Sequence, residues 1–468
     1  MKKSSIDTEN SAHQTVTEFI KLQTPTESIQ IGFTDQKVSG HAGIATFCGF
    51  LHWHRFGELL ARVLPHRRKS EKAIPPADLA LGFMAGILAG AKKLAQVAFL
   101  RRDVMLAPLL AIGRIASQST FTRFFQDFKT GGANLAAFRP LWRWSMERLA
   151  SRPGGYSLDL DWTRLLHEDG HQEGVAVGYT RLGTKPCLHP LLAVLEEAKL
   201  VVGFWLRPGN SSCANNIIAF TLDLLANLPK HIRLRLVRAD SGFCQPEWLD
   251  LLESHRLSYI VVARLLKPLQ RLVKKELLWT ASQVPGTDVA EVWHQEVNWK
   301  QPRRLILIRH HIAEKQRPGG KKLLDCRGYA FQALVTNLPT SVPPIEVWRD
   351  YNGRAGCEEV IKQLDADFAL PKLCLQKFWS TEAALSLAVL SYNLCVLFQR
   401  HLGWLDRVTA ATLRYRIFNT GGIISETGGR TTIRLAVRAE GERAWWRRLL
   451  EKLQSPVPNC NSVAAMWT

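Results

Sequence analysis

The alternation of apolar and polar positions between Gly155 and Arg264 predicts an α/β unit. Three strand-like runs come first, followed by a helical segment, a strand, a second helical segment and a fifth strand. These runs cover 156–166, 188–195, 200–206, 214–228, 233–239, 245–255 and 259–263. Asp159 and Asp161 share one face of the first strand because side chains alternate along a strand, and Asp240 follows the fourth strand.

The chain before this unit has the spacing of helices. From Gly40 to about Ala150 we expect helices over 50–63, 77–103 and 119–128, the last with a serine or threonine cap in the stretch that begins at Ser117, and a linking segment over about 139–155. Residues 1–30 are polar and are expected to form a loosely ordered arm. Basic side chains on this helical part fit either the binding of duplex DNA or a solvated face of a helical bundle.

The chain after Arg264 changes its pattern twice. Strand-like runs over 275–281, 289–299, 303–311 and 329–336, with a loop at Pro318, predict a β-rich insertion. Helices are expected over 382–402 and 442–453, and a strand over 431–437. The resulting division is a helical N-terminal domain (1–150), a core in two parts (151–265 and 341–410) around the insertion (266–340), and a C-terminal region (411–468).

The stretch from Trp348 to Asp365 has helical periodicity. It places five polar or aromatic residues on one face beside an apolar stripe. The face holds Tyr351, Arg354, Glu358, Lys362 and Asp365, and the stripe holds Cys357, Val360, Ile361, Leu364 and Phe368. Gly353 and Gly356 weaken a helix, so they either allow a phosphate backbone to approach or mark a helix start near Cys357. An ordinary amphipathic surface helix is the alternative.

The order tyrosine, two residues, arginine, three residues, glutamate at Tyr351, Arg354 and Glu358 resembles the signature of DDE transposases of bacterial insertion sequences. The resemblance implies an RNase H-like mixed sheet flanked by helices, in which the first and fourth strands lie side by side. Asp161, Asp240 and Glu358 are then the catalytic, metal-binding acids. Asp161 is favoured over Asp159 because the family's acid stands two residues before a threonine, here Thr163.

The resemblance also implies a chemistry and a set of partners. Three carboxylates suit two Mg²⁺ ions, for which Mn²⁺ substitutes, in cutting DNA ends and joining the 3′-hydroxyls to target DNA. The expected partners are the element's terminal inverted repeats, target DNA and a second copy of the chain. Tyr351, Arg354 and Lys362 are expected to contact DNA, and Trp293 or Trp299 to hold a flipped base. The family's usual lysine is replaced by Asp365, and Lys362 is the candidate substitute.

The charge and the cysteine content of the chain indicate its kind of binding partner and its cellular compartment. With 61 Lys and Arg against 41 Asp and Glu, the net charge of +20 favours a polyanionic partner, and we find no membrane anchor or secretory signal. Nine scattered cysteines without a CxxC motif fit a bacterial cytoplasm and offer no zinc site. The metalloprotease pattern at His167–His171 falls on a turn signal, which excludes the helix it needs. A nuclease without strand transfer and an inactive DNA-binding relic remain alternatives.

Overall fold

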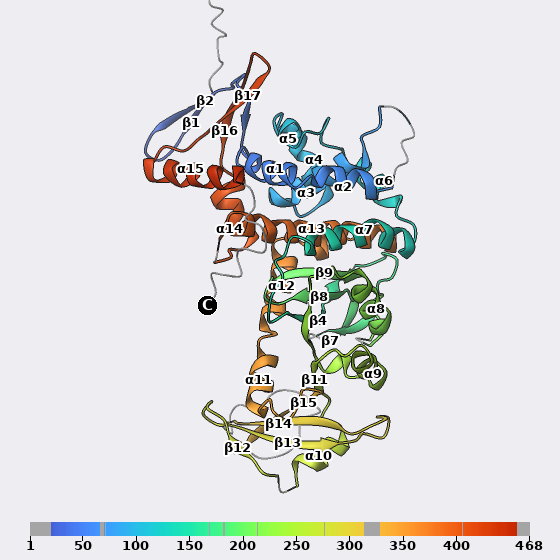
Figure 1. Ribbon diagram of the computed structural model, residues 1–468. Coiled ribbons are helices and arrows are strands. Elements are labelled where there is room, and N and C mark those ends of the chain that lie inside the picture. The colour runs from blue at the N-terminus through green and yellow to red at the C-terminus, as the bar shows by residue number, and fades with distance from the viewer. Residues whose placement is uncertain are drawn as a thin grey trace, which may run out of the picture.

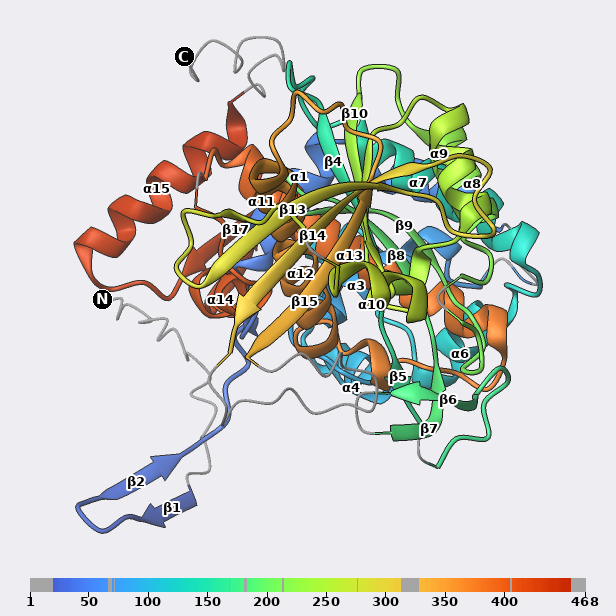
Figure 2. The same ribbon diagram turned by 90° about the horizontal axis from the view of Figure 1, so that it is seen from below.

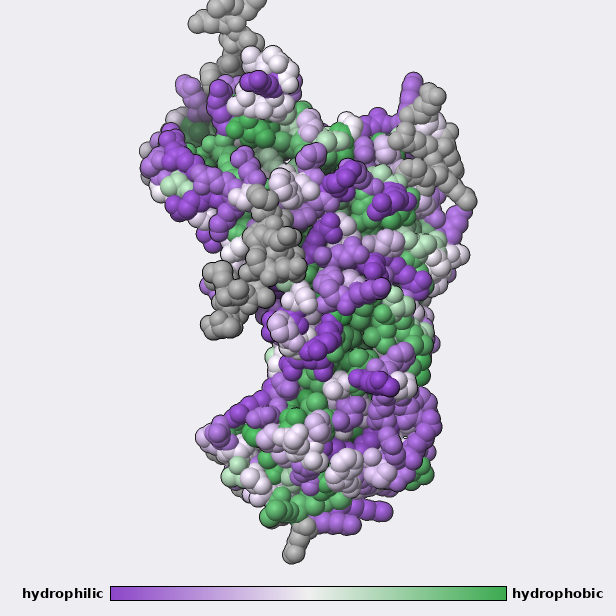
Figure 3. Space-filling model, in the orientation of Figure 1, coloured by the Kyte–Doolittle hydropathy of each residue, from purple (hydrophilic) through white to green (hydrophobic). Residues whose placement is uncertain are grey.

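The computed structural model describes residues 20–455, except 66–69, 71, 168, 181–182, 213, 276, 313–327 and 405. It is a mixed α/β protein in which a helical part lies on one end of a long twisted sheet (Figure 1). Hydrophilic side chains cover most of the face that Figure 3 shows.

The N-terminal helical layer contains more breaks than its periodicity predicts. Arg55 adopts a left-handed backbone conformation and divides the expected 50–63 helix, and Gly90 has a φ of 106° and ends another. A serine caps the third expected helix, in agreement with the expected serine or threonine cap, since the Ser117 side chain accepts a hydrogen bond from the Thr120 amide. The helices are α1 (Ile44–Trp53), α2 (Phe56–Val63), α3 (Pro76–Leu88), α4 (Leu94–Phe99), α5 (Leu106–Leu109), α6 (Gln118–Gln126) and α7 (Gly131–Met146).

The prediction of a linking segment over 139–155 is wrong for its first half. Helix α7 runs to Met146 despite Pro140 inside it, and it buries Phe138, Leu141 and Trp142. Its apolar face packs against strand β9 (Leu200–Trp205) and helix α13 (Phe378–His401). Burial of this face therefore outweighs the unfavourable proline.

Helix α13 is the shared core of the protein. It contacts α3, α6 and α7 of the helical layer and β9 of the sheet, so apolar side chains are needed around its whole circumference. Among the described residues it is the one helix long and apolar enough to cross a membrane, and it is buried inside the protein.

The predicted α/β unit forms the centre of a nine-stranded sheet. Its strands lie in the order β9-β8-β4-β10-β11, and the first and fourth strands along the chain, β4 and β10, are parallel neighbours as expected. β11 is parallel to β10, whereas β8 is antiparallel to β4 and to β9. The elements are β4 (Tyr156–Trp162), β8 (Leu191–Leu195), α8 (Ile217–Asn227), β10 (Leu234–Ala239), α9 (Pro246–Ser254) and β11 (Tyr259–Ala263).

The run predicted over 156–166 divides into two strands. After β4, Leu165–Leu166 forms β5, which joins β7 (Gly183–Leu188) and β6 (Ala176–Thr180) in a separate three-stranded sheet. The segment between β5 and β6 includes a turn in which the Gly170 amide donates to the His167 carbonyl. No helix is present in the described part of His167–His171, in agreement with the turn expected there.

The insertion continues the central sheet (Figure 2). β15 (Tyr329–Thr336) pairs antiparallel with β11, and β14 (Arg303–His311), β13 (Thr287–His294) and β12 (Thr280–Ala281) follow outward. The predicted run 275–281 is wrong except for its last two residues, and α10 (Lys267–Val273) precedes it. The predicted Pro318 loop lies outside the described residues.

A strand that follows the N-terminal hairpin and two strands near the C-terminal end of the described chain form a small sheet. β3 (Val38–Ser39) pairs with β16 (Gly422–Thr427), which pairs with β17 (Arg430–Leu435), and α15 (Glu440–Gln454) packs beside α1. The expected loose arm is wrong for residues 20–31, which form a hairpin of β1 (Ile20–Gln23) and β2 (Ser28–Ile31). Short helical turns over Leu370–Lys372 and Arg414–Phe418, with α14 (Ala410–Leu413), complete the C-terminal half.

Candidate active site

Asp161 and Asp240 lie at the same edge of the sheet. Leu160 of β4 is paired with Ala239 of the parallel strand β10, so the next residue of each strand is an aspartate. Asp240 also begins a 3₁₀ turn, and its Oδ1 accepts a hydrogen bond from the Gly242 amide at 2.8 Å. Burial raises the pKa of Asp161, and the nearby charge of Asp240 adds to this effect. The structure thus brings the two predicted aspartates together.

Arg354 holds the Asp161 carboxylate. Its Nη2 lies 2.8 Å from Asp161 Oδ2 and also donates to the Leu160 carbonyl at 3.1 Å. Asp161 Oδ1 accepts from the Trp162 amide at 2.8 Å, so both carboxylate oxygens have protein donors. Because the Arg354 side chain is buried, this ion pair joins the signature segment to the end of β4.

The signature segment is two helices rather than the single helix predicted. α11 (Pro344–Asn352) carries Tyr351 and ends at Gly353, and α12 (Ala355–Ala366) starts after Arg354. The apolar stripe is confirmed: Cys357, Val360 and Leu364 are buried. Arg354, however, does not share a face with Glu358 and Lys362, since it is buried whereas both of those residues are exposed.

The structure does not bring Glu358 to the two aspartates. Glu358 lies on α12 and makes no hydrogen bond or ion pair with any described residue. Within the described part of the chain, no three His, Cys, Asp or Glu side chains are placed to hold a metal ion. Asp161 and Asp240 therefore share a site, whereas Glu358 lies about one helical turn after Arg354 along the chain and is not part of that site.

Asp159 has a different partner from Asp161. Its two oxygens accept from Arg238 Nε at 2.6 Å and Nη2 at 2.8 Å, and neither side chain is more than 2% exposed. Arg238 Nη1 also donates to the Asp350 carbonyl near the end of α11. Asp159 thus anchors the arginine that holds the signature segment, a role that sequence reasoning did not find.

The two glycines of the segment allow close packing within the protein. A Cβ on Gly353 would lie 2.6 Å from Arg238 Nη1, and one on Gly356 would overlap the Lys199–Glu196 ion pair. The suggestion that these glycines admit a phosphate backbone is therefore wrong in this structure, because protein side chains fill the space beside both of them.

The remaining signature positions differ in exposure. Tyr351 is half-buried and burial raises the pKa of its hydroxyl, whereas Lys362 is exposed and has no ion-pair partner among the described residues. Asp365 stands where the family usually has lysine. Burial raises its pKa to about 6, and its Oδ1 has no hydrogen-bond partner in the described structure.

The two tryptophans predicted to contact DNA lie in different environments. Trp293, on β13, has a side chain that is 63% exposed. Trp299 is only 7% exposed, with its ring near His294 and the Arg303 guanidinium 5.2 Å from its centroid. The expectation that Trp299 offers an accessible stacking face is wrong in this structure, because its ring belongs to the core of the insertion.

Comparisons with known proteins identify the family. A solved structure, that of the piggyBac transposase synaptic complex with hairpin DNA, matches with a TM-score of 0.42 and 10% identity, over 91% of this chain and 85% of that one. No curated protein matches the chain. A family model described as "Transposase DDE domain group 1" matches residues 23–457, nearly the whole chain. The protein therefore belongs to the DDE transposases.

Proposed function

We propose that this chain is the transposase of an insertion sequence, which cuts the ends of its element and joins their 3′-hydroxyls to target DNA. The observation that carries the proposal is the placement of Asp161 and Asp240 at matching ends of two parallel strands. The strand order β9-β8-β4-β10-β11, with the first three strands antiparallel in turn, supports an RNase H-like core. The net charge of +20 supports DNA as the partner.

The three acidic residues of the proposed site carry the oxygen ligands that a hard divalent cation requires. Asp161 and Asp240 supply carboxylate oxygens, which Mg²⁺ prefers, and Glu358 is exposed in the first turn of α12 without a hydrogen bond or ion pair to a described residue. These three residues would hold two Mg²⁺ ions. When bound, the ions would activate the attacking water or 3′-hydroxyl and stabilise the leaving 3′-oxygen. For all three residues to bind the same pair of ions, Glu358 must move closer to Asp161.

Other residues of the chain would orient the substrate and the acids. Arg354 fixes the direction of the Asp161 carboxylate, and Arg238 holds the α11 end of the same segment. Lys362, exposed on α12, is suited to a phosphate contact. Trp293 remains the candidate for stacking on a DNA base, since its ring is accessible.

The proposal is tested with Asp161→Asn, Asp240→Asn and Glu358→Gln. Each variant should lose cleavage of an element end in Mg²⁺ while keeping end binding, because affinity comes mainly from basic contacts to phosphates. Mn²⁺ binding, measured by calorimetry without DNA, should weaken in the two aspartate variants. Robust cleavage by any one variant would remove that residue from the catalytic set.

A second candidate is a catalytically inactive DNA-binding relative. The separation of Glu358 from the two aspartates is the observation that favours it. Wild-type protein that binds the element's ends but yields no nicks in Mg²⁺ or Mn²⁺ would establish this alternative. Nicked ends without strand-transfer products would instead indicate a nuclease.

A further inference from the structure

The hairpin of β1 and β2 has one apolar face. Ile20 is paired with Ile31 and Leu22 with Ile29, and these two cross-strand pairs lie on the same side because they are two residues apart on each strand. The pairs on the other side, Lys21 with Gln30 and Gln23 with Ser28, are polar. Such a division is typical of a strand pair that buries one face.

The hairpin is well formed locally. The Thr24 amide and hydroxyl both donate to the Glu27 carbonyl, at 2.9 and 2.7 Å, and the Glu27 amide donates back to the Thr24 hydroxyl at 3.0 Å. The turn thus closes on itself. A two-stranded hairpin in water is nevertheless marginally stable without a surface to cover its apolar face.

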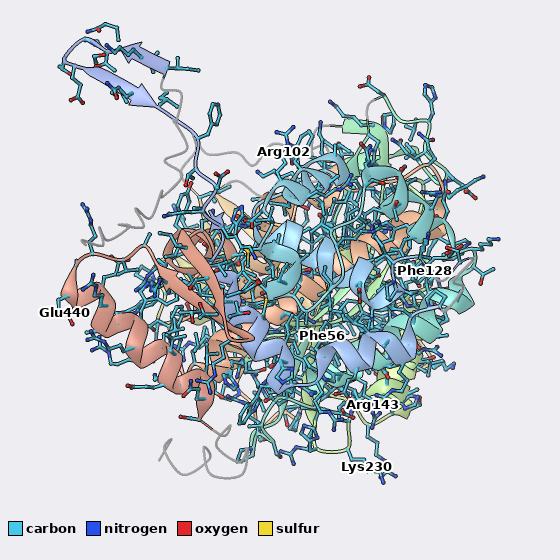
Figure 4. The ribbon with its side chains drawn as sticks, turned by 90° about the horizontal axis from the view of Figure 1, so that it is seen from above. Phe56, Arg102, Phe128, Arg143, Lys230 and Glu440 are labelled. Carbon is cyan, nitrogen blue, oxygen red and sulfur yellow. The ribbon has the colours of Figure 1, made fainter. Side chains whose placement is uncertain are left out.

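No described helix or strand covers the apolar face. Figures 2 and 4 show the hairpin extending away from the body of the protein, and no described helix or strand outside the hairpin packs extensively against it. The exposed apolar side chains of the hairpin are Ile20 (61%), Leu22 (52%), Ile29 (41%) and Ile31 (48%), and Phe33 (78%) follows two residues after β2.

The charge of the hairpin argues against DNA as the molecule that covers it. Between Ile20 and Phe33 the charged residues are Lys21 and Glu27, which cancel, although the chain as a whole carries +20. A phosphate backbone would be recognised by a surplus of Lys and Arg, whereas a neutral apolar face is recognised by another apolar protein surface.

We propose that this face packs against the same face of the hairpin in a second copy of the chain. The four apolar side chains of the hairpin together with Phe33, each burying on the order of 100 Å², give about 500 Å² per copy and about 1,000 Å² in total. This total reaches the lower limit for a specific interface. Two identical faces related by a two-fold axis also form a closed dimer, in which two small sheets stack in the manner of a sandwich.

The experiment uses the full chain without DNA, so its result does not depend on the proposed transposition. Wild-type protein should dimerise in the micromolar range in sedimentation equilibrium. A variant with Leu22→Lys and Ile29→Lys, and one with Leu22→Glu and Ile29→Glu, should each dimerise more than about 100-fold more weakly. Changes on the polar face, Lys21→Ser with Gln30→Ser, should leave dimerisation unchanged. The melting temperatures of all these variants should be close to that of the wild type, because the hairpin lies outside the core.

Mixing the lysine and glutamate variants gives the decisive result. If the two faces meet each other, the mixture should restore dimers, since opposite charges then lie across the interface. Dimers in both variants alone, or no dimer in the mixture, would overturn the proposal. A monomeric wild type at tens of micromolar would overturn it as well. Normal dimerisation combined with weaker DNA binding in the variants would show instead that the hairpin contacts DNA.

Discussion

The ion pair between Asp159 and Arg238 allows a sharp test of which aspartate belongs to the reaction. Asp159→Asn removes a charge that is fully buried and leaves the Arg238 guanidinium, 2% exposed, without its counter-charge. Charge centres about 4 Å apart attract by about 4 kcal/mol at an effective dielectric constant of about 20. Removing one partner of a buried pair commonly costs 3–5 kcal/mol, which is about the same value.

We therefore expect Asp159→Asn to lower the free energy of unfolding by about 3–5 kcal/mol. Asp161→Asn should lower it by about 1–3 kcal/mol, because Asp161 makes one rather than two bonds to its arginine and is close to the like charge of Asp240. The double change Asp159→Leu with Arg238→Met should recover most of the loss, since no unpaired charge is then buried.

Urea denaturation followed by tryptophan fluorescence measures these differences, and calorimetric titration with Mn²⁺ separates stability from metal binding. Asp159→Asn should bind the ion as wild type does, at a temperature where it is folded, and Asp161→Asn should not. The reasoning is refuted if the free energy of unfolding of Asp159→Asn lies within about 1 kcal/mol of the wild-type value. It is also refuted if Asp159→Asn alone loses Mn²⁺ binding.

Three other predictions concern single positions. Lys362→Ala should weaken strand cleavage and reduce the salt dependence of end binding, while Asp365→Ala should change neither; equal effects on the two in a salt titration would contradict the phosphate contact. Trp293→Ala should weaken binding of a DNA end by about 1–3 kcal/mol in a competition assay, whereas Trp299→Ala should mainly lower thermal stability. Burial raises the pKa of Glu382 from 4.5 to about 7 because it disfavours the charged carboxylate. The contribution of the protonated Glu382 to the stability of the fold is therefore complete below pH 4.5 and is lost as the pH rises through 7. Between pH 4.5 and pH 7 the free energy of unfolding of the wild type should fall by about 3 kcal/mol relative to that of Glu382→Gln. Parallel curves of unfolding free energy against pH for the two proteins would show that the Glu382 carboxyl does not titrate in this range.

The elements that the sequence predicts well are those with long apolar runs. β10, β11, β14, β15 and α13 agree with their predicted ranges to within a few residues, because burial on both faces leaves little choice of polar positions. Helix α7 was missed because Gly131, Gly132 and Pro140 are local signals against a helix. Packing on α13 and β9 overrides those signals, and this packing is not visible in the sequence.

The sequence predicts that Asp161 and Asp240 lie together, but it does not predict that Glu358 lies apart from them or that arginines pair with Asp159 and Asp161. Strand ends and the spacing of the signature indicate Asp161, Asp240 and Glu358. Arg238 pairs with Asp159 through the register of β10 and β4, whereas the pairing of Arg354 with Asp161 depends on where the junction of α11 and α12 lies relative to the end of β4. Residues 79 and 193 positions apart have no local pattern that links them. Arg238, one residue before the end of β10 and flanked by Val237 and Ala239, was a signal that could have suggested a buried, paired arginine.

The continuity of the nine-stranded sheet fixes the distance between Asp161 and Trp293, the two residues proposed to contact a DNA end. Five strand spacings separate β4, with Asp161, from β13, with Trp293, which corresponds to about 24 Å measured along the sheet. This span equals about seven nucleotide steps of a duplex at 3.4 Å each. Because hydrogen bonds join every strand in between, the span cannot change without breaking them. A DNA end that contacts both residues would therefore be measured against a fixed length, and the nucleotide that meets Trp293 would lie well away from the phosphate that reacts.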